Sequence, residues 1–136
     1  MRSDKMQMAN VPQTSEHLVF TSVDAGTCEE VDIRLPIGAI IEKMVVTTKA
    51  QMSAAVNLNV GSTDDEDKLT PTAIALDTAP VGDHTPQAWY VPISEFADRI
   101  IRFKADNATG SNATGEVYAY IQYRFAPNQI PMRIVD

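Results

Sequence analysis

The residues with the clearest capacity for chemistry are an acidic run, two histidines and one cysteine. Asp64–Asp67 is all acidic, and carboxylate oxygens are ligands that Ca²⁺ prefers. The run lacks the alternating ligands, the central glycine and the late glutamate of an EF-hand loop. Four adjacent like charges repel one another and are strongly hydrated, which favours an exposed loop tip. We therefore expect a solvated turn at this position and no metal.

The histidines and the cysteine are not arranged for catalysis. His17 and His84 are far apart in the sequence and have no zinc-ligand spacing, and Cys28 is the only cysteine. The sequence contains neither a G-x-S-x-G nucleophile elbow nor a G-x-x-x-x-G-K-[ST] phosphate loop. We expect no catalytic residue and no cofactor, and hence a protein that is not an enzyme.

Two aromatic pairs could contact a ligand or a partner. Trp89 and Tyr90 could form a platform that stacks against sugar, whereas Tyr118 and Tyr120 lie opposite the apolar face of their predicted strand. Aromatic side chains also anchor protein interfaces, which is the interpretation favoured for Tyr118 and Tyr120.

Composition limits the classes of partner. The 136 residues suit one domain with its own core, and the formal net charge of -7 repels phosphate backbones, so nucleic acid is a poor partner. No apolar run approaches the ~18 residues of a membrane span, and the polar N-terminus has no secretory h-region. A single cysteine is typical of a protein that folds in a reducing cytoplasm.

The elements that must position these side chains are strands. In Gly115–Phe125, the residues Val117, Ala119 and Ile121 share one face, while Tyr118 and Tyr120 share the other. Similar alternation recurs in Glu29–Leu35, Ser53–Val60 and Asp98–Ala105. No stretch sustains a helical period over three turns. The pattern predicts an all-β, single-domain β-sandwich, jelly-roll-like, with about 7–8 antiparallel strands.

The polar, proline-containing ends of the chain predict two arms. We place an N-terminal arm at residues 1–15, the sandwich at 16–125, and a C-terminal arm at 126–136, where Pro127 and Pro131 cannot continue a ladder in mid-sheet. Such arms can reach neighbouring subunits and become ordered on binding.

Three segments resemble a known group of proteins. Val31–Ile41 contains an apolar strand that ends in Leu-Pro-x-Gly-Ala, Val56–Asp65 contains a strand followed by glycine and acids, and Gly115–Tyr123 is a closing strand. Together they resemble small virion proteins of tailed bacteriophages, in particular the jelly-roll head decoration (cement) proteins of short-tailed phages. The resemblance implies an accessory protein on the outer capsid surface, which bridges major capsid protein subunits as a homodimer or homotrimer and has no catalytic residues.

This hypothesis assigns contacts to both arms, to the outward tyrosines and to three basic side chains that could pair with an acidic capsid surface. The candidate interface residues are Met6, Met8, Val11, Arg102, Lys104, Tyr118, Tyr120, Arg124, Phe125, Pro127, Ile130 and Ile134. The alternatives are a tail, baseplate or fibre component, and a carbohydrate-binding β-sandwich that uses Trp89 and Tyr90.

Overall fold

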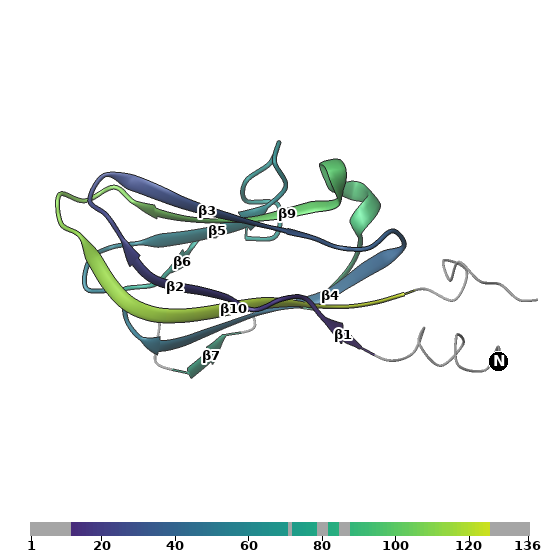
Figure 1. The fold of residues 1–136 in the computed structure, drawn as a ribbon, viewed down its shortest axis with the longest axis horizontal. Coiled ribbons are helices and arrows are strands. Elements are labelled where there is room, and N and C mark those ends of the chain that lie inside the picture. The colour runs from purple at the N-terminus through teal and green to yellow at the C-terminus, as the bar shows by residue number, and fades with distance from the viewer. Residues whose placement is uncertain (1–11, 71, 79–81, 85–87, 126–136) are drawn as a thin grey trace, which may run out of the picture.

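The chain is built almost entirely from strands (Figure 1). The computed structural model describes residues 12–70, 72–78, 82–84 and 88–125, with the backbone alone described for 82–84 and 88–90. The strands are β1 (Gln13–Thr14), β2 (Leu18–Val23), β3 (Thr27–Arg34), β4 (Ala39–Ala50), β5 (Asn57–Gly61), β6 (Ile74–Ala75), β7 (Gly82–His84), β8 (Ala88–Pro92), β9 (Ile100–Asn107) and β10 (Ala113–Phe125). Two short 3-10 helices, η1 (Ile93–Glu95) and η2 (Ala97–Arg99), connect β8 to β9.

These strands form two antiparallel sheets that face each other. In sheet A, β1 and β2 follow one another along one side of β10, β4 lies on its other side, and β7 and β8 both pair with β4. Sheet B has the order β3-β9-β5-β6. With β1/β2 and β7/β8 each counted as one interrupted strand, this is the strand order of a jelly roll. The predicted fold class is confirmed.

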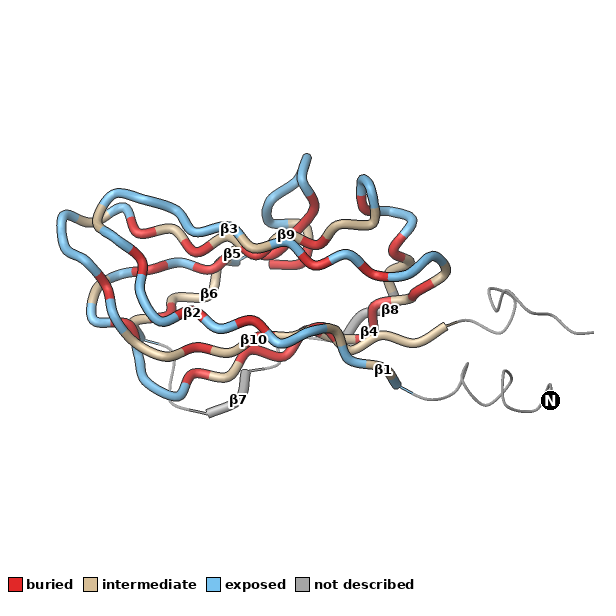
Figure 2. The backbone as a smooth tube through the Cα atoms, in the orientation of Figure 1, coloured by how far each residue is buried: buried red, intermediate tan, exposed pale blue. Residues whose placement is uncertain are grey.

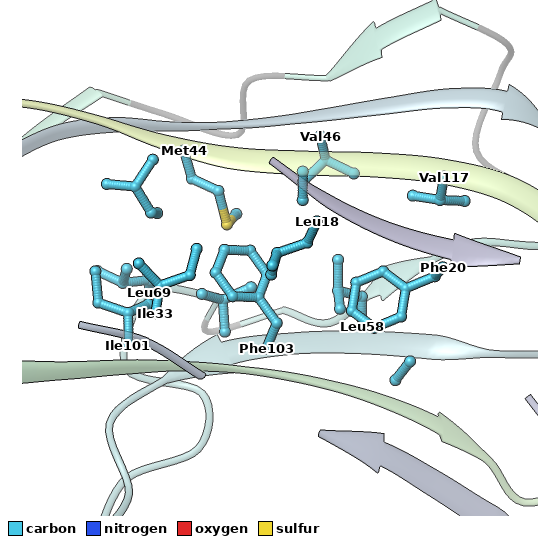
Figure 3. Packing of buried hydrophobic residues seen from close by; sticks show 14 of the residues in the cluster. Leu18, Phe20, Ile33, Met44, Val46, Leu58, Leu69, Ile101, Phe103 and Val117 are labelled. Atoms are coloured by element: carbon cyan, nitrogen blue, oxygen red, sulfur yellow. The ribbon is translucent and has the colours of Figure 1, made fainter. Parts of the chain in front are cut away.

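The core lies between the sheets and follows the predicted alternation. Met44, Val46 and Val117 extend from sheet A toward Leu58 and Phe103 of sheet B (Figure 3). All five are fully buried, and burying an aromatic or branched side chain stabilises the fold by roughly 1.5–3 kcal/mol. Figure 2 shows buried positions alternating with exposed ones at the start of β2 and with intermediate ones along β9.

Residues outside the regular strands also contribute to this core, and of these the alternation in Ser53–Val60 predicted Val56 alone. Met52 and Val56 precede β5, while Leu69 and Leu76 lie outside the regular strands, and all four are buried. The strand expected at Ser53–Val60 begins only at Asn57. In this segment, the alternation of apolar residues therefore predicted which side chains are buried better than it predicted where the strand begins.

The end of the sandwich that carries the β9–β10 loop is held by one buried amide. Asn107 donates through Nδ2 to the carbonyls of Val23 (3.0 Å) and Ser111 (2.9 Å), and its Oδ1 accepts hydrogen bonds from the Thr109 amide (3.0 Å) and hydroxyl (2.6 Å). Asn112, in the loop between β9 and β10, is exposed and accepts one hydrogen bond from the Ala25 amide (2.8 Å). Both asparagines thus tie this loop to the chain around Val23 and Ala25.

Gly61 allows the acidic loop to fold back over sheet B. A Cβ at this position would lie 2.1 Å from the Asp65 carbonyl oxygen and 2.6 Å from the Glu66 carbonyl carbon, so no larger residue fits without moving the loop backbone. The loop tip stands out from the sandwich beside β9 (Figures 1 and 2), and Asp64–Asp67 are exposed. The loop carries Glu66 to the outer face of sheet B.

The predicted arms lie mostly outside the described residues. Residues 1–11 and 126–136 are not described, but Gln13 and Thr14, placed in the N-terminal arm by the sequence analysis, pair with Tyr123 and Gln122 of β10. The described chain therefore starts within sheet A. Both ends of the described chain lie at the same end of the sandwich, because Gln13 is in register with Tyr123, two residues before Phe125.

Replacing Asn107 tests whether the buried amide holds this end. Asn107→Ala leaves the buried Val23 carbonyl without this donor and should lower the free energy of unfolding by roughly 2–3 kcal/mol. Asn112→Ala is the matched control and should cost no more than about 1 kcal/mol, because its bond is exposed. Chemical denaturation of both variants measures the difference. Equal losses would show that Asn107 has no special role.

Candidate interaction surface

The outer faces of the two sheets differ in chemistry. On sheet B, Arg102 of β9 donates from Nε to Asp32 Oδ1 (2.8 Å) and from Nη2 to Asp32 Oδ2 (3.1 Å), and it lies 4.0 Å from Glu30. Lys104 Nζ lies 2.8 Å from Glu66 Oε2. Both basic residues of sheet B that we predicted to contact a capsid are therefore already paired within the chain.

These pairs affect ionisation in the expected direction. The hydrogen bonds from Arg102 hold the pKa of the Asp32 carboxyl below its usual range, and the bond to Glu66 raises the pKa of Lys104. Arg102 and Asp32 are both partly exposed, so the solvent screens their attraction. The outer face of sheet B is thus a charged surface whose cations are largely neutralised by its own acids.

The outer face of sheet A carries the tyrosines. The ring of Tyr120 stacks on His17, with centroids 4.6 Å apart and planes at 13°. The Tyr118 hydroxyl donates to the Glu116 carboxylate, which raises the pKa of Tyr118, and Lys49 Nζ lies 5.4 Å from the centroid of the Tyr118 ring. Both tyrosines are half-buried by contacts within the chain. His17 is therefore part of an aromatic stack on this face.

The third predicted basic contact, Arg124, also has an internal partner. At the bulge between Ile41 and Lys43 the extra residue is Glu42, whose carboxylate is buried. Arg124 Nε forms an ion pair with Glu42 that lacks the geometry of a hydrogen bond, and Gln122 Nε2 donates to Glu42 Oε1 (3.0 Å). The pair fixes the C-terminal end of β10 against β4.

The structure distributes the predicted interface over separate places. Tyr118, Tyr120 and Arg124 lie on the outer face of sheet A, and Arg102 and Lys104 lie on the opposite face of the sandwich. Phe125 packs partly against the core and meets Tyr123 edge-on, with centroids 5.9 Å apart. The remaining arm residues, Met6, Met8, Val11, Pro127, Ile130 and Ile134, lie outside the described residues, as do the side chains of Trp89 and Tyr90.

An exposed apolar residue that is not among the predicted interface residues lies at the same end of the sandwich as the two ends of the described chain. Ile37, in the turn between β3 and β4, is 73% exposed. Two residues before Ile37, the Leu35 carbonyl accepts a hydrogen bond from Arg99 Nη1 (2.8 Å). Arg99 and the preceding Asp98 both have positive φ (58° and 56°). Two consecutive non-glycine residues with positive φ are uncommon. The Pro36-Ile37-Gly38 sequence was visible as a turn, but the exposure of Ile37 was not.

Cys28, the only cysteine in the sequence, is hydrogen-bonded to a neighbouring strand. The Cys28 thiol donates to Asp106 Oδ1 (3.2 Å), and this hydrogen bond raises the pKa of the thiol, which disfavours the nucleophilic thiolate. Among the residues that the structure describes, no group of three or more His, Cys, Asp or Glu side chains could hold a metal ion. No helix within the described ranges is long and apolar enough to cross a membrane.

Comparison with known proteins relates the chain by fold alone. No protein-family model matches the sequence, and no curated protein matches it significantly. The jelly roll is similar to a chain of the solved cyanophage Pam1 capsid asymmetric unit, with a TM-score of 0.57 over 84% of this chain and 84% of that one. The sequence identity is 19%, so the similarity is one of architecture.

The Arg102–Asp32 pair predicts a dependence of stability on pH. The folded-state pKa of Asp32 is depressed, so its contribution is fully present above the unfolded pKa, near ~4, and is lost as the pH falls through the folded value. Asp32→Asn should therefore cause a small loss of stability at neutral pH that disappears in acid. Denaturation of both proteins at pH 7 and below pH 3 measures this. A loss that persists unchanged in acid would contradict the ion-pair origin.

Proposed function

We propose that this protein is a virion structural protein that decorates an assembled phage capsid and stabilises it by bridging major capsid protein subunits. The observation that carries the proposal is the jelly-roll similarity to a chain of a phage capsid asymmetric unit, which extends over 84% of both chains. The strand order of both sheets supports it, because the match rests on the whole sandwich and not on one hairpin. The proposed place is the outer capsid surface, and the proposed role requires no catalysis.

The physical mechanism is binding to one state. A protein that binds only the assembled shell stabilises that shell by RT ln(1 + [L]/Kd) at each site, or about 2.7 kcal/mol when the free concentration is 100 times Kd. Many copies on one shell multiply this contribution. A rigid sandwich suits the role, because little conformational entropy is lost from a body that is already ordered.

The end of the sandwich that carries both described chain ends is the proposed contact with the shell. Ile37 is exposed there, and Phe125 of β10 and Gln13 of β1 lie on neighbouring strands. The described part of the chain therefore begins and ends on this side. The proposal includes homodimers or homotrimers on the shell, in which the arms reach a second copy of the chain.

Add-back of the purified protein to capsid shells that lack it tests the proposal. The protein should cosediment with the shells, raise the temperature at which they open, and give density on the outer head surface in cryo-microscopy. Density on the tail would support a tail or fibre component instead. Binding to a glycan array that depends on Trp89 and no binding to shells would favour the carbohydrate alternative.

Truncation tests the contribution of the N-terminal arm. Removing residues 1–11 leaves every described strand intact, so the free energy of unfolding should change little, while the affinity for shells should fall at least tenfold. Denaturation and cosedimentation measure the two effects separately. The matched comparison is Ile37→Ser, which removes an exposed apolar contact from the same end. Unchanged affinity in both variants would mean that this end does not face the shell.

A further inference from the structure

The sandwich has four sheet edges, and three of them are poorly suited to pairing with another strand. At one edge of sheet B, β6 has two residues, and at one edge of sheet A, β7 has three residues and β8 ends in Pro92. The other edge of sheet B is β3, which carries Glu29, Glu30 and Asp32. Short strands, prolines and charges are the means by which proteins prevent edge-to-edge association.

Glu29 shows how the edge at β3 is protected. It is in register with the buried Ala105, so its side chain lies on the inner face of sheet B, yet Glu29 is exposed. An acidic residue on the inner face of an edge strand would become buried if a further strand paired with β3, which would cost free energy.

The fourth edge, β2, lacks these features. Leu18–Val23 contains no charge, no proline and no glycine, and its β-branched and aromatic residues suit a strand. Among the described residues β2 pairs with β10 alone. Val19 is 48% exposed on the outer face. An uncharged, open edge of this kind favours the addition of a strand.

Hydrogen bonds of the neighbouring strand show which backbone groups of sheet A face the N-terminal strand. The Ser15 amide donates to the Ile121 carbonyl (2.9 Å), and the Ile121 amide donates to Ser15 Oγ (2.9 Å). Both backbone groups of Ile121 therefore point toward the N-terminal strand. Since this direction alternates along a strand, the groups of Ala119 and Val117 point the same way.

The open groups of β2 follow from its register. Ala119 is opposite Leu18 and Val117 is opposite Phe20, so these two residues of β2 are bonded to β10. The N–H and C=O groups of Val19 and Thr21 consequently point away from β10, toward the open edge. Opposite Thr21, between the pairs Val117–Phe20 and Thr114–Ser22, a bulge on β10 interrupts the register, so the regular part of this edge is short.

Charges around the edge indicate the kind of partner. Glu16 and Asp24 flank β2, and Glu29 lies on β3, the edge strand on the same side of the sandwich (Figure 1). None of the three forms an ion pair with another described residue. A second copy of this chain would bring a like set of acids against them, whereas a strand flanked by lysine or arginine would be attracted.

We propose that the open edge of β2 binds an extended, basic segment of the shell protein, which adds a strand to sheet A through hydrogen bonds to Val19 and Thr21. The identity of the partner rests on the proposed function. The backbone supplies the bonds, and Glu16, Asp24 and Glu29 select a basic segment. This contact is independent of the two arms, and it would fix the orientation of the sandwich on the shell.

Thr21→Pro tests the edge, because proline removes the amide that the partner would bind, and Thr21→Val is the control that keeps it. We expect Thr21→Pro to lower the affinity for shells at least tenfold and Thr21→Val to leave it unchanged. In the wild type, amide exchange at Val19 and Thr21 should slow at least tenfold on shells. If Thr21→Pro fails to fold, the exchange measurement on the wild type decides alone.

The charge requirement has its own matched pair of variants. Glu29→Lys should weaken binding to shells at least threefold at low salt, while Asp67→Lys, the same reversal of charge in the exposed acidic loop beside sheet B, should not. Wild-type binding with unchanged exchange at Val19 and Thr21 and full binding by Thr21→Pro would overturn this inference and leave the proposed function standing. No wild-type binding would overturn both. A wild-type dimer in solution that Thr21→Pro dissociates would identify a second copy as the occupant and overturn the basic-partner proposal.

Discussion

The pairing of β10 with β4 is the constraint on which the rest of the structure depends. These are the two longest strands, and their register runs from Glu116 opposite Ala50 to Phe125 opposite Ala39. Every other strand of sheet A is attached to one of them. Sheet B then packs against the apolar face that this pair presents. Because side chains alternate across a strand, the same pairing that buries Val117 and Ile121 must carry Tyr118 and Tyr120 to the outer face.

Two bulges interrupt the pairing of β10 with β4. The irregularity between Gln122 and Tyr123 inserts Glu42, whose buried carboxylate then requires the partners Arg124 and Gln122. The other irregularity lies near Gly115, where a Cβ would be 2.8 Å from the Ala50 carbonyl oxygen. A bulge at each end bends the long strands over the core, and the first directs the end of β10 at the point where the described chain stops.

Much of the fold could be predicted from the sequence, because alternation is a local signal. Ile33, Phe103 and Ile121 all belong to segments whose alternation predicted one buried face, and all three are buried. The interface assignments were harder, because they depend on contacts between residues far apart in the chain. Arg102 looked available as a contact until the fold placed Asp32 opposite it. No pattern in the sequence predicts this ion pair, because the register that brings the two residues together is set by the whole sheet.

The distribution of charge gives the two sheets different roles. The cations on the outer face of sheet B are paired with acids of the same chain. Acidic residues on β3 also disfavour the pairing of another strand with that edge. Sheet A buries the carboxylate of Glu42 beside Arg124, presents aromatic rings outward, and leaves the uncharged strand β2 at its edge. In a protein with a net charge of -7, an uncharged edge bordered by acids combines attraction for a basic segment with repulsion of identical copies. The basic partner proposed for β2 rests on this combination of an open backbone edge and the acids that surround it.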